Sequence, residues 1–264
     1  MKKYYKIIIS SLLFIGCKKD IKLNLNNATS QIVIEGIVSD KSTTQTVTIS
    51  KSVNFYDPNI YPGVTGAKVV ISDNGATPDT ATELPGGVYQ IQGMSATYGH
   101  TYYLFVTIAG TSYTAQSTMP YPVPLNDITF YTNNPGAKPD KLEYSAIPKF
   151  NDPIQYQNNY RFVQYDNGVK DNTVIVRNDV VTNGKTNEEP IFSRDFKIHK
   201  SDSVTVEMYG IDKNVYQYFY LLSTIEGSGP GGGTTPSNPT SNISSGVLGY
   251  FAAQTYQAKT VIVP

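Results

Sequence analysis

Short stretches of alternating apolar and polar residues dominate the chain beyond about residue 30. In residues 101–110, for example, Tyr102, Leu104, Val106 and Ile108 fall on one face of an extended strand. Six such stretches, rich in β-branched and aromatic residues, follow one another with turn residues between them. They occupy residues 31–40, 44–53, 66–73, 87–93, 101–110 and 111–119. Six strands at this spacing predict an immunoglobulin-like or transthyretin-like β-sandwich over residues 31–119.

A proline-rich segment, MPYPVPLNDI (119–128), separates these strands from a second region. Its three prolines favour extended backbone with few hydrogen bonds, which is typical of a domain boundary. We therefore place a second β-rich domain over residues 120–264. Its predicted strands are 127–133, 141–147, 158–166, 172–181, 192–199 and 202–210, and residues 246–264 have the pattern of two more.

One segment of the second domain has helical periodicity. Apolar residues recur at helical spacing between 215 and 222, and Asp212 is suited to cap the first turn. We predict one α-helix near residues 212–226, with its aromatic stripe packed on a sheet. The next residues, 227–242, are rich in glycine and proline and predict a flexible loop.

The first seventeen residues have the pattern of an export signal. Three lysines precede an apolar run that ends at Gly16, and this run is about half the roughly 20 residues that a membrane-spanning helix needs. Residues 14–17, FIGC, resemble a bacterial lipobox in which Phe14 takes the place of the usual leucine. Cleavage between Gly16 and Cys17 would remove a signal peptide over residues 1–16 and leave a terminal thiol for lipid attachment. The alternative is an ordinary signal peptide that ends near a buried cysteine.

Acyl chains on Cys17 would anchor the protein firmly, since each buried methylene contributes roughly 0.8 kcal/mol. Residues 17–30 are polar and rich in asparagine, so we interpret them as a lipidated tether between the membrane and the folded body. We therefore expect the protein to contact a membrane through its N-terminal lipid.

The amino-acid composition argues against several classes of function. The 21 basic and 21 acidic residues give no net charge, which argues against nucleic acid as a partner. Cys17 is the only cysteine and the chain has only two histidines, so we expect no disulfide, no thiolate nucleophile and no metal site. No nucleophile elbow or phosphate-binding loop is present in the sequence either. We predict no cofactor and no enzymatic activity.

Three acidic stretches have simpler interpretations than a calcium or catalytic site. The segments SDNGATPD (72–79) and YDNGVKDN (165–172) lack the spacing of a calcium loop and predict hairpin turns, because Asn and Gly accept positive φ. Glu188 and Glu189 are neighbours in sequence and so point apart, which favours a solvated loop.

Six segments in order resemble the family called domain of unknown function 4249, lipoproteins of Bacteroidota-type bacteria. They are the lipobox, VIEGIVSD (33–40), TSYTAQSTMPYPVPL (111–125), FNDPIQYQNNYRF (150–162), NDVVTNGKT (178–186) and NPTSNISSGVLGYFAAQTYQAKTVIV (238–263). The resemblance implies an outer-membrane lipoprotein, often encoded beside a TonB-dependent transporter. It implies no established biochemical activity.

Two motifs of that family map onto this chain. Its closing G-x-L-G-Y-F pattern matches Gly246, Gly249, Tyr250 and Phe251, and its D-P...N-Y-x-R stretch matches Asp152, Pro153, Tyr160 and Arg161. We interpret both as structural, with glycines allowing close backbone approach and aromatics filling a core. Arg161 needs a carboxylate partner such as Asp152, or else it must face solvent.

The residues after Cys17 bear on location. Lys18 is not the aspartate that retains lipoproteins at the inner membrane of well-studied Gram-negative systems, so we expect the outer membrane. Surface export in Bacteroidota-type bacteria tends to use acidic residues soon after the cysteine, and Asp20 alone leaves the choice of membrane face open. Asp-Thr-Ala and Asp-Ser-Val triplets also resemble the O-glycosylation sites of this bacterial group, which makes Thr80 and Ser203 candidates for modification.

Three hypotheses for the function follow. The first is a non-enzymatic accessory lipoprotein that binds a TonB-dependent transporter or the solute it imports. The second is a surface adhesin or glycan-binding module, which an exposed cluster of two or three tyrosines would favour. The third, a hydrolase, would need carboxylates that converge in a cleft, about 5–10 Å apart for a glycosidase.

The anchor yields a direct prediction. Metabolic labelling with an acyl analogue is expected to label the wild-type protein and to leave Cys17→Ser unlabelled, because the terminal thiol is the attachment point. The measurement is the label recovered on the immunoprecipitated chain. An unlabelled wild type, or label that survives in Cys17→Ser, would contradict it.

Overall fold

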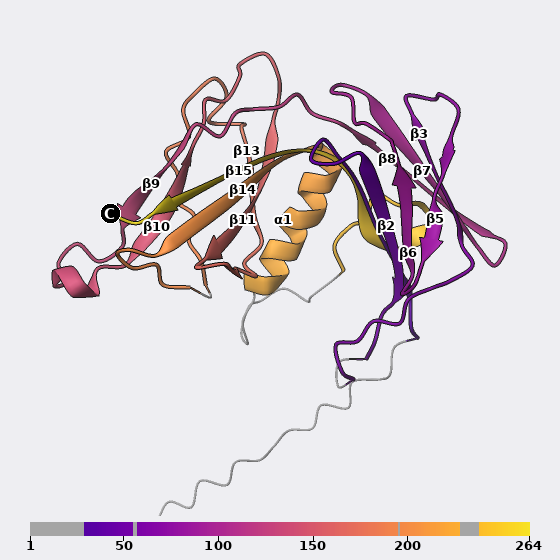
Figure 1. The fold of residues 1–264 in the computed structure, drawn as a ribbon, viewed down its shortest axis with the longest axis horizontal. Coiled ribbons are helices and arrows are strands. Elements are labelled where there is room, and N and C mark those ends of the chain that lie inside the picture. Colours follow the sequence, from indigo (N-terminus) through magenta and orange to yellow (C-terminus); the bar gives the residue numbers. More distant parts are fainter. Residues whose placement is uncertain (1–28, 55–56, 195, 228–237) are drawn as a thin grey trace, which may run out of the picture.

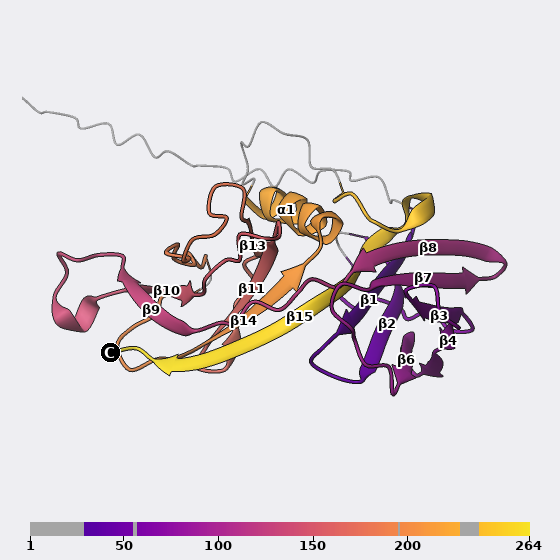
Figure 2. The same cartoon turned by 90° about the horizontal axis from the view of Figure 1, so that it is seen from above.

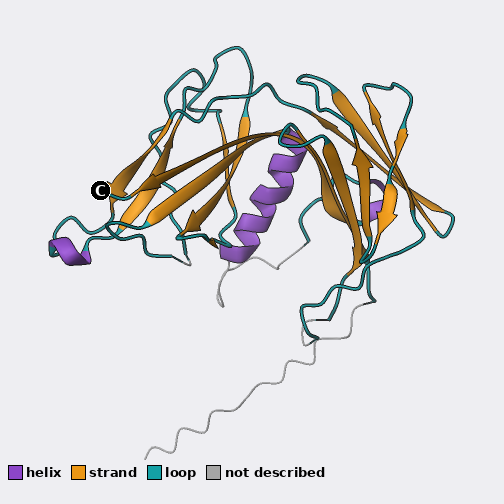
Figure 3. Cartoon of the chain, viewed as in Figure 1, coloured by secondary structure: helices purple, strands orange, loops and turns teal. Residues whose placement is uncertain are grey.

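The structure, a computed structural model, describes residues 29–54, 57–194, 196–227 and 238–264. These residues form fifteen β-strands, one α-helix and two short 3-10 helices (Figure 3). The predicted mainly β fold with a single α-helix is therefore confirmed. Within the described ranges, no helix is long and apolar enough to cross a membrane. Gly16 and Cys17 lie outside these ranges, as do most of the tether and residues 228–237 of the predicted loop.

The N-terminal half folds into two sheets packed face to face (Figure 1). One contains the order β5-β6-β2-β1, and the other has the order β4-β3-β7-β8. Ile34, Ile71, Tyr89 and Leu104 are among the buried side chains between them. The strands are β1 (Ile32–Ser39), β2 (Thr44–Lys51), β3 (Lys68–Asp73), β4 (Asp79–Thr80), β5 (Thr82–Leu84), β6 (Val88–Gln92), β7 (Thr101–Ile108) and β8 (Thr111–Thr118). All six strands predicted here are present, and the short exposed β4 and β5 are additional.

The second half contains a hairpin, a strongly twisted group of strands and the helix α1 (Lys213–Gly227). The hairpin pairs β9 with β10, and β11 pairs with β12 and β13 along one edge and with β14 along the other. The remaining elements are β9 (Asp127–Thr132), η1 (Pro139–Lys141), β10 (Tyr144–Lys149), β11 (Asn159–Asp166), β12 (Val169–Lys170), β13 (Ile175–Asn178), β14 (Ser203–Ile211), η2 (Ser244–Gly246) and β15 (Leu248–Ile262).

The last strand, β15, belongs to both halves of the molecule. Its residues 248–254 pair in parallel with β1, and its residues 255–262 pair antiparallel with β14. A single sheet with the order β12-β11-β14-β15-β1-β2-β6-β5 therefore runs through the whole protein. Figure 2 shows β15 crossing from the N-terminal sandwich to the far side of the second half.

Side chains alternate along β15 between three cores. Phe251 and Ala253 are buried in the sandwich core, and Val261 packs against the core beneath the β9-β10 hairpin. Tyr250 and Ala252 point the other way and pack against α1. Because successive strand residues point to opposite faces, one strand serves the sandwich and the hairpin with one face and the helix with the other.

The helix covers the sheet where the two halves meet (Figure 1). Val215 and Phe219 of α1 are buried against Ile211 and Tyr250. Asp212 Oδ1 accepts hydrogen bonds from the backbone N–H groups of residues 214 and 215, at 2.8 and 2.9 Å, so Asp212 is the N-cap that the sequence predicted.

Both Asp-Asn-Gly segments form hairpin turns. Asn74 and Gly75 have φ of 49° and 79°, and Asn167 and Gly168 have φ of 50° and 81°. Consecutive positive φ angles are the signature of the tight turns that join adjacent strands. The prediction of turns is confirmed in both places.

Three other expectations need correction. The described residues of the predicted strand 192–199, which are 192–194 and 196–199, are irregular, with an isolated bridge from Ile198 to Tyr144. The end of the chain forms one long strand instead of two. Residues 243–253 contribute side chains to the sandwich core, although the sequence analysis places them in the second domain of 120–264. Period-two alternation marks a strand but does not say which sheet it joins.

Gly249 tests the parallel pairing of β15 with β1. Its φ is +98°, and an added Cβ would lie 2.0 Å from the carbonyl oxygen of Ile34. We expect Gly249→Ala to lower the free energy of unfolding by about 2–4 kcal/mol through backbone strain and steric overlap. Gly246→Ala is the matched control: φ is +65° but nothing lies within 4 Å, so a loss of about 1 kcal/mol is expected. Urea titration measures both, and equal losses would contradict the pairing.

Candidate functional site

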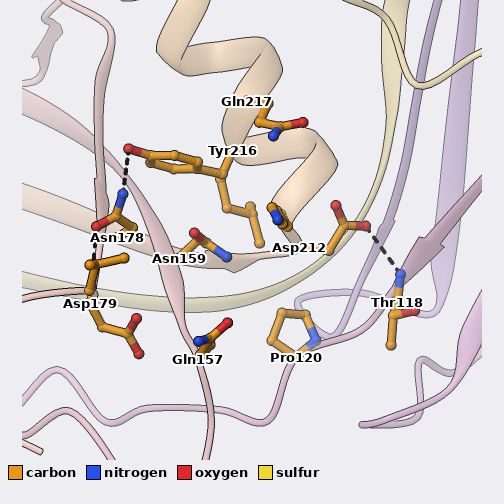
Figure 4. Close-up of a pocket in the computed structure, with 12 residues that line it drawn as sticks. Thr118, Pro120, Gln157, Asn159, Asn178, Asp179, Asp212, Tyr216 and Gln217 are labelled. Carbon is orange, nitrogen blue, oxygen red and sulfur yellow. Dashed lines mark hydrogen bonds between the residues drawn. The ribbon is translucent and has the colours of Figure 1, made fainter. Parts of the chain in front are cut away.

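A cleft of about 380 Å³ opens where the end of β8, the start of α1 and the edge of β11 and β13 come together. Figure 4 shows Asn159 at its centre, with Gln157 and Pro120 on one side and Tyr216 and Gln217 on the other. The cleft therefore takes its walls from both halves of the molecule. Its lining residues are Thr118, Pro120, Gln157, Asn159, Asn178, Asp179, Val180, Ile211, Asp212, Lys213, Tyr216 and Gln217.

Asp212 fixes the wall where the two halves meet. Besides capping α1, its Oδ2 accepts hydrogen bonds from the Ser117 hydroxyl and from the Thr118 N–H, the latter at 3.2 Å. The Ser117 hydroxyl in turn accepts a hydrogen bond of 2.8 Å from the N–H of Ala253. One carboxylate thus ties β8, α1 and, through Ser117, β15 together.

The opposite wall is a pair of loops held by two buried carboxylates. Asp152 accepts hydrogen bonds from the Tyr160 hydroxyl and, at 3.2 Å, from the Gly184 N–H. Asp179 accepts a bond of 2.6 Å from the Asn158 N–H. Burial, followed by the bond to Asp152, raises the pKa of Tyr160 far above its usual value, so the Tyr160 hydroxyl keeps its proton near neutral pH. The loops are therefore cross-linked where they border the cleft.

Neutral carboxamides supply the available hydrogen-bonding groups of the cleft. The side chains of Gln157, Asn159 and Gln217 make no hydrogen bond to any described residue. Asn178 is different, because its Nδ2 donates to the Tyr216 hydroxyl at 2.9 Å. Each free carboxamide offers two donor hydrogens and one acceptor oxygen to a ligand.

Two exposed aromatic residues are next in the chain to residues that line the cleft. Tyr121 and Tyr156 stack with their ring centroids 4.9 Å apart and an interplanar angle of 19°, and about half of each side chain is exposed. Tyr121 directly follows Pro120, and Tyr156 directly precedes Gln157. Both Pro120 and Gln157 line the cleft. Large exposed aromatic surface is unusual on a protein unless it serves recognition.

A second polar cluster lies farther along the helix-covered face of the sheet, around Glu207 of β14. The hydroxyls of Tyr209, Tyr256 and Tyr165 donate to its carboxylate at 2.6, 3.0 and 3.3 Å, and Lys41 Nζ lies 3.5 Å away. Burial by itself would raise the pKa of Glu207, but these hydrogen bonds and the positive charge hold it below its ordinary value. Burial, and then contact with Glu207, raises the pKa of Tyr209.

The contacts of the second cluster set the charge of its central group. Glu207 is held in its charged form, and burial, followed by contact with Glu207, raises the pKa of Tyr165 as it does that of Tyr209. In the cleft, Asp179 and Asp212 already accept hydrogen bonds from the protein. Among the described residues, no group of three or more His, Cys, Asp or Glu is placed to hold a metal ion. The cleft also contains the exposed ammonium group of Lys213.

Arg161 differs from both expectations for it. Tyr160, and not Arg161, bonds to Asp152, because the two residues point to opposite faces of β11. The Arg161 guanidinium instead lies over the ring of Phe219, 4.3 Å from its centroid, and 5.6 Å from that of Tyr209. A cation over aromatic faces satisfies a partly buried arginine without a carboxylate.

The other predicted residues lie away from the cleft. Thr80 is exposed on the edge strand β4, and Ser203 is partly buried at the start of β14, where its N–H donates to Asn167. Glu188 and Glu189 are exposed and pair with different cations, Lys149 and Arg177, so they do form a solvated loop.

The sequence analysis missed the cleft because its members are far apart in the chain and are common residue types. The cleft takes residues from four segments that only the shared sheet and helix bring together, among them Pro120, Gln157, Asn178 and Gln217. Free carboxamides have no spacing rule of the kind that reveals a metal or phosphate site.

The chain is similar to one protein family over most of its length. A family model described as "Domain of unknown function (DUF4249)" matches residues 18–260. No curated protein matches the chain significantly. The chain also aligns with a solved structure of the adhesin InvE of Yersinia pseudotuberculosis, at 16% sequence identity and a TM-score of 0.21. The alignment covers 68% of this chain and 55% of the adhesin chain. The chain thus spans little more than half of that adhesin chain, and a TM-score of 0.21 is too low to indicate a shared fold.

The role of Asp212 in the cleft wall can be measured. Asp212→Ala removes an N-cap and leaves the Ser117 hydroxyl and the Thr118 N–H without their acceptor. We expect it to lower the free energy of unfolding by about 2–4 kcal/mol. Hydrogen exchange should rise at the end of β8 as well as in the first turn of α1. Lys213→Ala, at the next and exposed position, is the control and should cost less than about 0.5 kcal/mol. Faster exchange in α1 alone would contradict the link between the halves.

Proposed function

The chain belongs to the family of domain of unknown function DUF4249, and on that basis we propose that it is a non-enzymatic lipoprotein of the outer membrane. In this proposal Cys17 carries the lipid, and the folded body binds a TonB-dependent transporter or the solute that the transporter imports. The lipobox-like FIGC segment supports the anchor, and Lys18 behind Cys17 supports the outer membrane. The order of family motifs along the chain supports the partner.

The observation that supports the binding role is that the carboxylates of the cleft are hydrogen-bonded within the protein, whereas several of its carboxamides are not. Its carboxylates, Asp179 and Asp212, are used to hold loops and elements in place. Among the described residues of the cleft, the carboxamides of Gln157, Asn159 and Gln217 are left free, beside the exposed ammonium group of Lys213. A catalytic site needs ionisable groups free to exchange protons or attack a bond, whereas a binding site needs fixed walls and satisfiable polar groups.

The cleft walls also suit a protein that must present a fixed surface. Cross-linked loops lose little entropy when a partner binds, because they are already ordered. The network of Asp152, Asn158 and Asp179 and the three-way link at Asp212 provide this order. We place the recognition surface at this corner of the molecule.

Copurification tests the proposed role. The full chain with a C-terminal affinity tag, extracted from native membranes in mild detergent, is expected to carry a TonB-dependent β-barrel transporter with it. Deleting the gene should reduce uptake through that transporter. Cys17→Ser is the matched control, because it keeps the folded body but removes the anchor, and it should restore uptake poorly. If no transporter copurifies and uptake is unchanged by deletion, the proposal fails.

A further inference from the structure

We propose that the cleft between β8, α1 and β13 is a binding site for a neutral carbohydrate, with Tyr156, Gln157 and Asn159 among its contacts. The inference deepens the proposed function, on which it rests, by naming the chemical class of the ligand. The ligand class follows from four properties of the cleft, which are its hydrogen-bonding groups, its charge, its aromatic border and its rigidity.

The hydrogen-bonding groups match a polyhydroxylated ligand. A sugar hydroxyl both donates and accepts, and a carboxamide does the same through its NH₂ and its C=O. Gln157, Asn159 and Gln217 bring three free carboxamides to one space. Asn178 and Tyr216 add a fixed pair, since the amide donates to the tyrosine oxygen at 2.9 Å and leaves the tyrosine hydroxyl hydrogen free to donate. Purely apolar ligands would leave these groups unsatisfied, which costs about 1–3 kcal/mol for each buried group.

The charge of the cleft disfavours ionic ligands. An anionic ligand such as a phosphate ester normally meets arginine or lysine forks, and the one basic residue that lines the cleft is the exposed Lys213. A cation would need free carboxylates, but the Asp212 carboxylate already accepts four hydrogen bonds and Asp179 is 3% exposed. An uncharged ligand is the one that these groups satisfy best.

The aromatic border supplies apolar contact. Sugar rings have one face of C–H groups, and flat aromatic side chains with a polar tip are suited to cover such a face while staying hydrated. Tyr121 and Tyr156 form a stacked pair, each about half exposed, and are next in the chain to the lining residues Pro120 and Gln157. Val180, which is 77% exposed and lines the cleft, extends the apolar surface.

The walls are held before any ligand binds. The loop with Tyr156 and Gln157 is tied to the loop with Val180 by the bonds of Asp152 to Gly184 and of Asp179 to Asn158. Carbohydrates bind weakly where a protein must first order its loops, so this cross-linking contributes directly to affinity. A volume of about 380 Å³ lies in the range of small-molecule sites and suits a short oligosaccharide segment.

Binding of neutral oligosaccharides to the purified full chain in detergent tests the inference. The probes are malto-, cello-, xylo- and manno-oligosaccharides of four to six units. Isothermal titration calorimetry measures their affinity for the protein. We expect at least one to bind, and sulfated or sialylated oligosaccharides not to bind better. Tyr156→Ala and Gln157→Ala are each expected to weaken binding about five- to tenfold. Both residues are exposed, so neither substitution should affect folding.

Tyr131→Ala is the matched control, because Tyr131 is as exposed as Tyr156 but lies in β9, which contributes no residue to the cleft lining, whereas Tyr156 directly precedes the lining residue Gln157. It should leave binding unchanged. The inference is overturned if no neutral oligosaccharide binds, if an apolar peptide or a charged glycan is the better ligand, or if Tyr131→Ala weakens binding as much as Tyr156→Ala. The result is independent of copurification. Sugar binding without a transporter would overturn the transporter role alone, and a transporter without sugar binding would overturn the carbohydrate site alone.

Discussion

The pairing of one strand with two different neighbours is the constraint on which the rest of this structure depends. β15 lies parallel to β1 along its first half and antiparallel to β14 along its second. Each strand of a sheet fixes the register of the strand that pairs with it. Because β15 pairs with a strand of each half, it sets the register between the N-terminal sandwich and the second half. Gly249 allows the close approach to Ile34 that the parallel half requires. The two halves are thus parts of one sheet, and α1 packs across their junction.

The cleft is a product of this shared sheet. Asp212 lies where β14 ends and α1 begins, and it reaches Ser117 and Thr118 only because β15 brings β8 beside it. The carboxylates of this corner hold elements together, and the neutral amides remain free. Charged groups hydrogen-bond more strongly than neutral ones, which suits these carboxylates to holding elements together.

Local patterns in the sequence were enough to predict most elements. Alternation revealed the strands of the sandwich, helical spacing and Asp212 located α1, and Asn-Gly pairs located two hairpin turns. These features depend on residues close in sequence. The segment 192–199 has strand-like composition, but its described residues meet the edge of β10 through one isolated bridge, from Ile198 to Tyr144, so the pattern failed there. The division of β15 between two sheets and the meeting of Tyr121 with Tyr156 depend on contacts between distant segments, for which one sequence carries no local signal.

The parallel pairing of β1 with β15 also has a consequence for how the protein reaches its folded state. Val33 and Leu248 are roughly 200 positions apart, so β1, whose neighbour β2 follows it directly in the chain, receives its second neighbour only after all of the intervening chain has been made. Contacts of such long range form slowly, and an incomplete sheet edge is open to wrong pairing until they do. A chain arranged in this way completes its central sheet only once its last strand has been made.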